Sequence, residues 1–230
     1  MNNMDFEKDF LIYIDNHIIV VRKPAGMLIQ GDKTGDITLF DLTKFYIKNK
    51  FEKPGNVYLA IVHRLDRPVS GVIVFARTSK AAARLNEQIR KRKMKKTYWA
   101  LVHGKPPKQG EFIDYINRNQ KTSIISNNKK GKRAELNYLL LKQQDNISML
   151  EIDLVTGRHH QIRVQFANRG YPILGDFLYG SRLKYGNRAL ALHACRLSFA
   201  HPVQNEEKSF FTMPDENWPK NFLPKNKELT

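Results

Sequence analysis

The sequence lacks the features that would place it among secreted or membrane proteins. It has a single cysteine, Cys195, so no internal disulfide can form. No apolar run approaches the roughly 20 residues that a helix needs to cross a bilayer. Residues 1–16 carry acids where a secretory signal would carry basic residues before an apolar stretch. We therefore expect a cytoplasmic protein without a membrane segment.

The sequence also lacks the common motifs of metal and nucleotide chemistry. No HExxH pattern, cysteine pair, glycine-rich phosphate loop or GxSxG turn is present. His159 and His160 are adjacent, so on a helix their side chains would point about 100° apart. We therefore expect no metal and no cofactor.

Acidic residues are few, which leaves a strongly basic chain. The 230 residues include 39 Lys and Arg against 22 Asp and Glu, a formal net charge of +17. Such a charge attracts polyanions. The cations are densest in two clusters, which are Arg90, Lys91, Arg92, Lys93, Lys95 and Lys96, and Lys129, Lys130, Lys132 and Arg133. Either cluster can be a solvated face, but few apolar residues accompany them, so nucleic acid is favoured over a membrane surface.

The hydrophobic pattern predicts many strands and few helices. Without regular alternation of strand and helix, this indicates an α+β fold with a mixed, mostly antiparallel sheet. Helices are expected after the caps Asp36 and Ser79 and over 158–168. Strands are expected at 10–13, 18–22, 57–62, 71–76, 97–102, 112–116, 134–141, 147–155, 189–199 and 209–212. We expect a single domain over 1–230 with its core at about 10–214.

Two segments are expected to lie outside regular structure. Residues 117–133, rich in Asn and Lys, form the one predicted loop long enough to be functional or mobile. The Lys, Asn and Pro of 215–230 predict a loosely held tail.

One carboxylate stands in an unusual setting. Asp66 lies between Arg64 and Arg67, and apolar strands flank this short segment on both sides. Positive neighbours keep a carboxylate ionised, which suits a nucleophile. An aspartate in a salt-bridged turn would give the same local pattern.

The surrounding sequence resembles a known family. Residues 63–76, HRLDRPVSGVIVFA, closely resemble the signature of the RluA-type RNA pseudouridine synthases. Four further blocks are similar to family blocks and follow in the same order: VVRKPAG at 20–26, KTYWA at 96–100, TGRHHQIR at 156–163 with YPILGD at 171–176, and LHA at 192–194. The resemblance implies a pseudouridine synthase catalytic domain, with helices and loops flanking the sheet around a central RNA-binding cleft.

The resemblance also implies roles for individual residues. Asp66 would be the catalytic nucleophile, Tyr98 would stack on the target uracil and serve in proton transfer, and Arg163 would pair with Asp66. Arg64 would enter the RNA stack where the flipped nucleotide has left. Further residues are expected at the RNA-binding site: Lys23, Arg67, Arg158, His160, Gln161, Lys91, Arg92 and Lys93. For Lys23, Arg158, His160 and Gln161, and for His193, the expected role is structural or RNA-orienting and not chemical.

The chain departs from the family pattern in two places. Val69 replaces the usual Thr, and His159 stands where a small hydroxyl residue is common. The first block lies so close to residue 1 that we expect no N-terminal RNA-binding domain, which many relatives carry.

The implied activity is isomerisation of uridine to pseudouridine in ribosomal or transfer RNA, by an enzyme that acts on a flipped-out nucleotide. No obligatory protein partner is expected, and a monomer is the default. A non-catalytic RNA-binding or ribosome-associated protein of the same fold is the first alternative. A nuclease using His63, His160 and His193 is the second.

Overall fold

The computed structural model divides the chain into two compact units, which are described one at a time. The structure describes residues 5–32, 34–126 and 130–223. The first unit comprises residues 1–96 and 194–212, and the second comprises 97–193 and 213–230.

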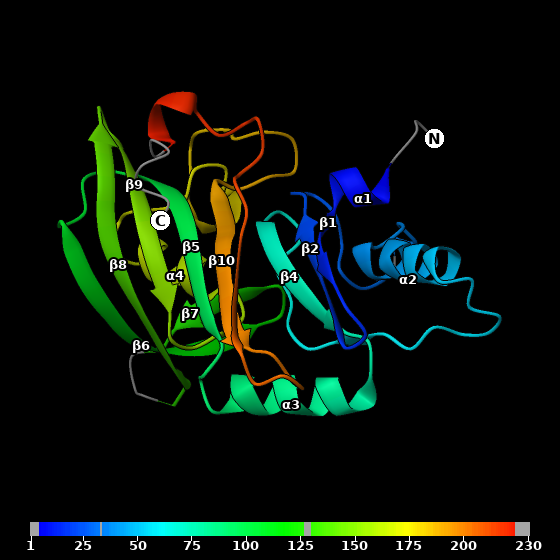
Figure 1. The fold of residues 1–230 in the computed structure, drawn as a ribbon. Coiled ribbons are helices and arrows are strands. Elements are labelled where there is room, and N and C mark those ends of the chain that lie inside the picture. The colour runs from blue at the N-terminus through cyan, green and yellow to red at the C-terminus, as the bar shows by residue number, and fades with distance from the viewer. Residues whose placement is uncertain (1–4, 33, 127–129, 224–230) are drawn as a thin grey trace. The chain divides into compact units, whose positions relative to one another are not determined.

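The first unit is built on a twisted set of short strands (Figure 1). Strand β2 pairs antiparallel with β1 and with β4, β3 pairs antiparallel with β4, and β10 pairs antiparallel with β11. Strand β10 is also the neighbour of β4. The elements of this unit are α1 (Phe6–Asp9), β1 (Leu11–Ile14), β2 (Ile18–Lys23), α2 (Leu39–Lys50), β3 (Ala60–Ile61), β4 (Ser70–Ala76), α3 (Ser79–Arg90), β10 (Leu192–Ala200) and β11 (Glu207–Phe211).

Strands β2 and β4 are buried on both faces, which explains their continuous apolar sequence. Ile18 and Val20 face a core cluster that includes Leu85 of α3, whereas Ile19 and Val21 face a second cluster with α2. Helix α3 therefore covers one face of these strands and α2 covers the other. The loops at the strand ends are anchored to this packed core.

Two helix caps differ from the predictions. Thr38, and not Asp36, accepts the N–H of Asp41 at 3.1 Å, and Thr78, and not Ser79, accepts the N–H of Ala81 at 3.1 Å. Each predicted cap was close to a threonine that is better placed to bind the first turn. The carboxylate of Asp36 is instead paired with Arg67.

The second unit contains an antiparallel sheet in the order β5, β9, β8, β6, β7. Phe112, Tyr138 and Phe166 pack edge to face or tilted in its core, with centroids 4.9 to 5.4 Å apart. Because Phe166 belongs to α4, this packing holds α4 against the sheet. The elements are β5 (Lys95–His103), β6 (Gln109–Asn119), β7 (Thr122–Ile125), β8 (Lys132–Gln144), β9 (Ile147–Leu154), α4 (Gln161–Ala167) and the 3-10 helices η1 (Phe177–Tyr179) and η2 (Lys220–Phe222).

The prediction of one long loop over 117–133 was wrong. Strand β6 continues to Asn119 and turns directly into β7, which pairs with it from Ile116↔Ile125 to Asn119↔Thr122. The strand was missed because its short β-branched run lies between polar Asn and Lys residues that are typical of loops. Lys129, from the second predicted basic cluster, lies outside the described residues.

The prediction of a loosely held tail was wrong for residues 215–223. Trp218 and Phe222 are both buried, and Trp218 packs edge to face on Tyr185 at 6.3 Å. The two aromatic side chains are four residues apart in an otherwise polar stretch, so its composition hid them. Residues 224–230 lie outside the described part of the chain.

The predicted α+β class with a mostly antiparallel sheet is confirmed by these strand pairs and their covering helices. The predicted single domain and central cleft stay predictions. Within the residues described, no helix combines the length and the apolar character needed to span a bilayer.

Candidate active site

Asp66 lies in the loop that joins β3 to β4, at residues 62–69. The loop closes on itself where the N–H of Val69 donates to the carbonyl oxygen of Asp66 at 3.1 Å. At its start, Nε2 of His63 accepts the N–H of Val74 at 3.1 Å. Val69 is buried, so the side chain that replaces the usual threonine packs into the core beside the loop.

His63 is held as a neutral ring. Burial, followed by the charge of Lys96, lowers its pKa well below 6.5. A neutral imidazole can accept the Val74 N–H, whereas an imidazolium has no acceptor. This histidine therefore supports the loop, and a role in RNA cleavage is not favoured by its surroundings.

Lys23, the last residue of β2, also holds this loop. Its side chain is fully buried, and Nζ donates to the carbonyl oxygens of Pro24 at 3.1 Å, Arg67 at 2.9 Å and Val69 at 2.6 Å. Burial lowers its pKa to about 7, while the charge of Asp66 acts to raise it. Of the two roles expected for Lys23, the buried ammonium with its three carbonyl acceptors favours the structural one.

Arg67 is also used within the loop. Its Nε donates to the carbonyl oxygen of Gly26 at 3.0 Å, its own carbonyl accepts the N–H of Gly26 at 2.8 Å, and its guanidinium pairs with Asp36. Arg67 therefore joins the first sequence block to the loop, and an RNA contact would have to share it with Asp36. Arg64, two residues before Asp66 in the sequence, is exposed.

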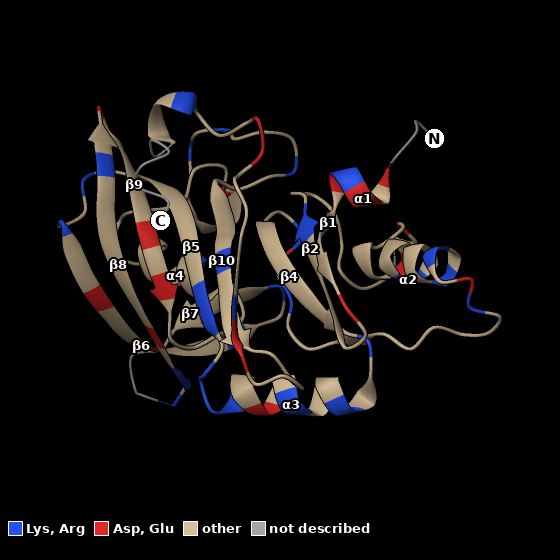
Figure 2. Cartoon of the chain, viewed as in Figure 1, with Lys and Arg blue, Asp and Glu red and all other residues tan. Residues whose placement is uncertain are grey.

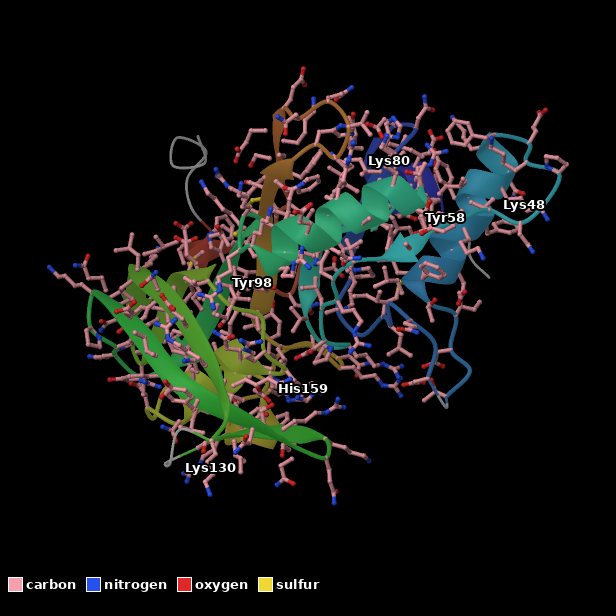
Figure 3. The ribbon with its side chains drawn as sticks, turned by 90° about the horizontal axis from the view of Figure 1, so that it is seen from below. Lys48, Tyr58, Lys80, Tyr98, Lys130 and His159 are labelled. Carbon is pink, nitrogen blue, oxygen red and sulfur yellow. The ribbon has the colours of Figure 1, made fainter. Side chains whose placement is uncertain are left out.

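Arg163 and Tyr98 belong to the second unit. Tyr98 lies on β5 (Figure 3), is buried, and pairs with Ile152 of β9. Arg163 lies on α4 and makes a buried two-point ion pair with Asp176, from Nε at 2.7 Å and Nη2 at 2.8 Å. Such a bidentate pair fixes the plane of the guanidinium.

Tyr179 supports Arg163 from a second direction. Its ring lies 5.1 Å from the guanidinium carbon. Its hydroxyl oxygen accepts the N–H of Ser123 on β7 at 2.7 Å and lies 2.9 Å from Nδ1 of His160. Tyr179 therefore links Arg163, β7 and His160.

His159, the second departure from the family pattern, is tied to the same strand. The Ser123 hydroxyl donates to the His159 carbonyl oxygen at 2.7 Å and lies 3.0 Å from its Nδ1. The rings of His159 and His160 stack with centroids 3.8 Å apart. His159 lies in the turn before α4 (Figure 3), so the departure adds a contact between this turn and β7.

Gln161 and Arg158 organise the same turn. The Gln161 side-chain oxygen accepts from Thr156 Oγ1 at 2.8 Å and from the Arg158 N–H at 3.0 Å, and its nitrogen donates to the Glu135 carbonyl at 3.1 Å. Gln161 is buried. Of the two roles expected for Gln161, these hydrogen bonds favour the structural one. Arg158, which donates to the Arg133 carbonyl at 2.9 Å, is only half-buried.

The first basic cluster runs from the end of α3 through the turn and into the start of β5, where Figure 2 shows consecutive basic residues. Lys91, Arg92 and Lys93 are exposed, and Lys91 pairs with Glu87 at 2.7 Å. Arg92 has a positive φ of 56°, which turns the chain out of the helix. These three side chains therefore form a solvated, cationic surface, whereas Lys96 of the same cluster is half-buried and burial lowers its pKa to about 8.

Sequence reasoning missed Asp176, Tyr179 and Asp36. Asp176 was within a recognised block, YPILGD, but nothing in a single sequence indicates that it meets Arg163 thirteen residues earlier. Among the described residues, no three His, Cys, Asp or Glu side chains gather as a metal site would require.

Comparison with known proteins identifies the family. The profile of the RNA pseudouridylate synthase family matches residues 17–168. The chain belongs to this family. The predicted family is thus confirmed, and with it the predicted class of enzyme, an isomerase that converts uridine to pseudouridine in RNA.

Individual relatives agree with this membership. Ribosomal large subunit pseudouridine synthase D of Zymomonas mobilis is 35% identical over 215 residues, covering 87% of this chain and 67% of the relative. Ribosomal large subunit pseudouridine synthase C of Buchnera aphidicola from Acyrthosiphon pisum is 34% identical over 215 residues, covering 89% and 66%. The chain therefore spans about two thirds of the length of these curated relatives.

The fold has solved counterparts. Human RNA Pseudouridylate Synthase Domain Containing 4 superposes with a TM-score of 0.74 at 23% identity, over 90% of this chain and 88% of that one. Human RNA Pseudouridylate Synthase Domain Containing 1 gives 0.71 at 25% identity, over 97% and 88%. These structures confirm the fold that the motifs predicted.

Proposed function

We propose that this chain isomerises uridine to pseudouridine in RNA with Asp66 as the nucleophile. The observation that carries the proposal is the loop at 62–69, which the buried Lys23 and the half-buried His63 hold in place around a carboxylate. A rigid loop places a reactive group precisely, which is a large part of the catalytic advantage of an enzyme.

The reaction replaces the bond between the ribose and a ring nitrogen of uracil with a bond to a ring carbon. The bond from the ribose to ring nitrogen 1 breaks, the base rotates, a bond to ring carbon 5 forms, and carbon 5 gives up its proton while nitrogen 1 gains one. No redox change is involved, so no cofactor is proposed. The stacked base must first be flipped out, at a cost of a few kcal/mol.

The partners of Asp66 are assigned in the same proposal. Tyr98 would stack on the uracil and take part in proton transfer, and Arg163 would pair with Asp66 while Asp176 fixes its guanidinium plane. Arg64 would fill the space of the flipped nucleotide. The exposed Lys91, Arg92 and Lys93 would hold phosphates.

The substrate is proposed from the relatives. Two of them are named for the large ribosomal subunit, so large-subunit ribosomal RNA is the first substrate to test. Transfer RNA is the second. We further propose that the protein acts in the cytoplasm as a monomer.

The test is Asp66→Asn, which keeps the shape of the side chain and removes its charge. We expect no pseudouridine in a large-subunit transcript incubated with the variant, measured by mass spectrometry, and RNA affinity close to wild type. Asp145→Asn, an exposed aspartate in the turn after β8, is the matched control and should retain full activity.

Other outcomes favour the alternatives. Normal turnover by Asp66→Asn would exclude it as nucleophile. RNA binding by the wild-type protein without any pseudouridine would favour a non-catalytic RNA-binding protein, and strand breaks would favour a nuclease.

A further inference from the structure

The loop that follows Asp176 exposes large apolar side chains. Phe177 is 62% exposed, Leu178 52% and Leu183 45%. All three belong to residues 175–183, here called the 175–183 loop. Adjacent exposed Phe and Leu side chains are a costly arrangement, and in soluble proteins such groups commonly mark a binding surface.

The 175–183 loop is closed by its own hydrogen bonds. The N–H of Gly175 donates to the carbonyl oxygen of Leu183 at 3.0 Å, and the N–H of Ser181 donates to the carbonyl oxygen of Asp176 at 3.0 Å. The Ser181 hydroxyl accepts the Gly175 N–H and donates to the Leu183 carbonyl, each at 3.2 Å. The exposed side chains therefore stand on a fixed backbone.

The loop is also fixed to the proposed catalytic arginine. Asp176 and Tyr179, on either side of Phe177 and Leu178, hold the Arg163 guanidinium by the ion pair and the ring contact described above. Tyr179 further connects the loop to β7 through Ser123. A platform that is already rigid loses little conformational freedom when a ligand binds.

The charge around these side chains indicates the chemistry of the ligand. Residues 177–190 contain three cations, Arg182, Lys184 and Arg188, and no acidic residue. All three cations are exposed. Aromatic surface beside cations suits single-stranded nucleic acid, whose bases stack on rings while phosphates meet the cations.

We propose that Phe177 and Leu178 form a stacking platform for an unpaired base of the substrate RNA, with Arg182 and Lys184 holding adjacent phosphates. The inference rests on the proposed function for the identity of the RNA. In this proposal the 175–183 loop contacts a base of the RNA and also orients Arg163. The same loop would therefore position both the RNA and the arginine.

The test compares Phe177→Ala with Phe45→Ala, an exposed phenylalanine on α2 that is 67% accessible. The affinity of each variant for a short single-stranded oligouridylate, and for a duplex RNA of equal length, is measured by fluorescence anisotropy. We expect Phe177→Ala to weaken single-strand binding roughly tenfold, duplex binding to change little, and Phe45→Ala to behave as wild type.

Equal affinity of Phe177→Ala and wild type for the single strand would overturn the platform. Equal weakening for single strand and duplex would also overturn it, because stacking needs an unpaired base. These binding measurements require no isomerisation, so a failed platform is distinguishable from a failed Asp66 assignment.

A second variant reports the contact directly. Trp99 and Trp218 are buried, so a tryptophan introduced as Phe177→Trp would dominate quenching by iodide. Oligouridylate should protect this tryptophan. If iodide still quenches this tryptophan at saturating oligouridylate, RNA does not cover the site and the proposal is overturned. A protein partner would then be the alternative occupant of this surface.

Discussion

Lys23 illustrates how a charged residue can serve a site without contacting its substrate. Its Nζ meets three carbonyl oxygens, and two of them belong to the loop that carries Asp66. An ammonium has three N–H donors in a compact group, so it matches three converging acceptors. The side chain thereby fixes the backbone on which the proposed nucleophile stands.

Replacing Lys23 with methionine tests this role. Lys23→Met keeps the apolar stem but leaves three carbonyl oxygens without their donor, so we expect the free energy of unfolding to fall by about 3 kcal/mol. Pseudouridine formation should fall as well. Denaturant unfolding measures the first effect, with Lys48→Met as control, because Lys48 projects exposed from α2 (Figure 3). An unchanged unfolding free energy would contradict the role.

Among the elements, the hairpin of β6 and β7 lies in the basic stretch 117–133 and contacts the residues that surround Arg163. Ser123 of β7 contacts His159 and Tyr179, which lie at the turn before α4 and in η1. The first basic cluster is different, because Lys91, Arg92 and Lys93 lie exposed beyond the end of α3. Its proposed task is phosphate contact alone.

Neutralising Lys91, Arg92 and Lys93 together, each to glutamine, should weaken RNA binding and reduce its dependence on salt. Each lost phosphate contact lowers the slope of log affinity against log salt by about 0.7 for a single strand, so the slope should fall by up to about 2. Filter binding at several salt concentrations measures it.

The control is Lys48, Lys50 and Lys53 to glutamine at the end of α2. Each set of three contains one lysine in an exposed ion pair, Lys91 with Glu87 and Lys50 with Glu7. Equal slopes for the two triple variants would show that the cluster at α3 is only a solvated face.

At the scale of the whole molecule, the chain returns to complete its first unit. Residues 194–212 rejoin this unit after the chain has built most of the second one. Gly71 allows the return, because a Cβ there would lie 2.4 to 2.5 Å from the backbone of Ala194, and its φ is 136°. Only glycine accommodates both the close approach and the conformation.

Gly71→Ala should therefore destabilise the fold by about 2 kcal/mol or more, because the strand β10 must move or the backbone must strain. Denaturant unfolding of the full chain measures this loss. Gly55→Ala is the control, since a Cβ at Gly55 meets nothing within 4 Å and its φ is not positive. Equal unfolding midpoints for the two variants would contradict the packing argument.

The family, the fold class and the proposed nucleophile could all be predicted from the sequence. They follow from short contiguous motifs, which can be identified without knowing their tertiary contacts. Tertiary structure alone decided the roles of Lys23, Gln161 and Asp176. The acceptors of Lys23 include backbone carbonyls 44 and 46 residues away, and the partner of Asp176 is a side chain on another element. A backbone carbonyl carries no residue identity, so such pairings exist only once the chain has folded.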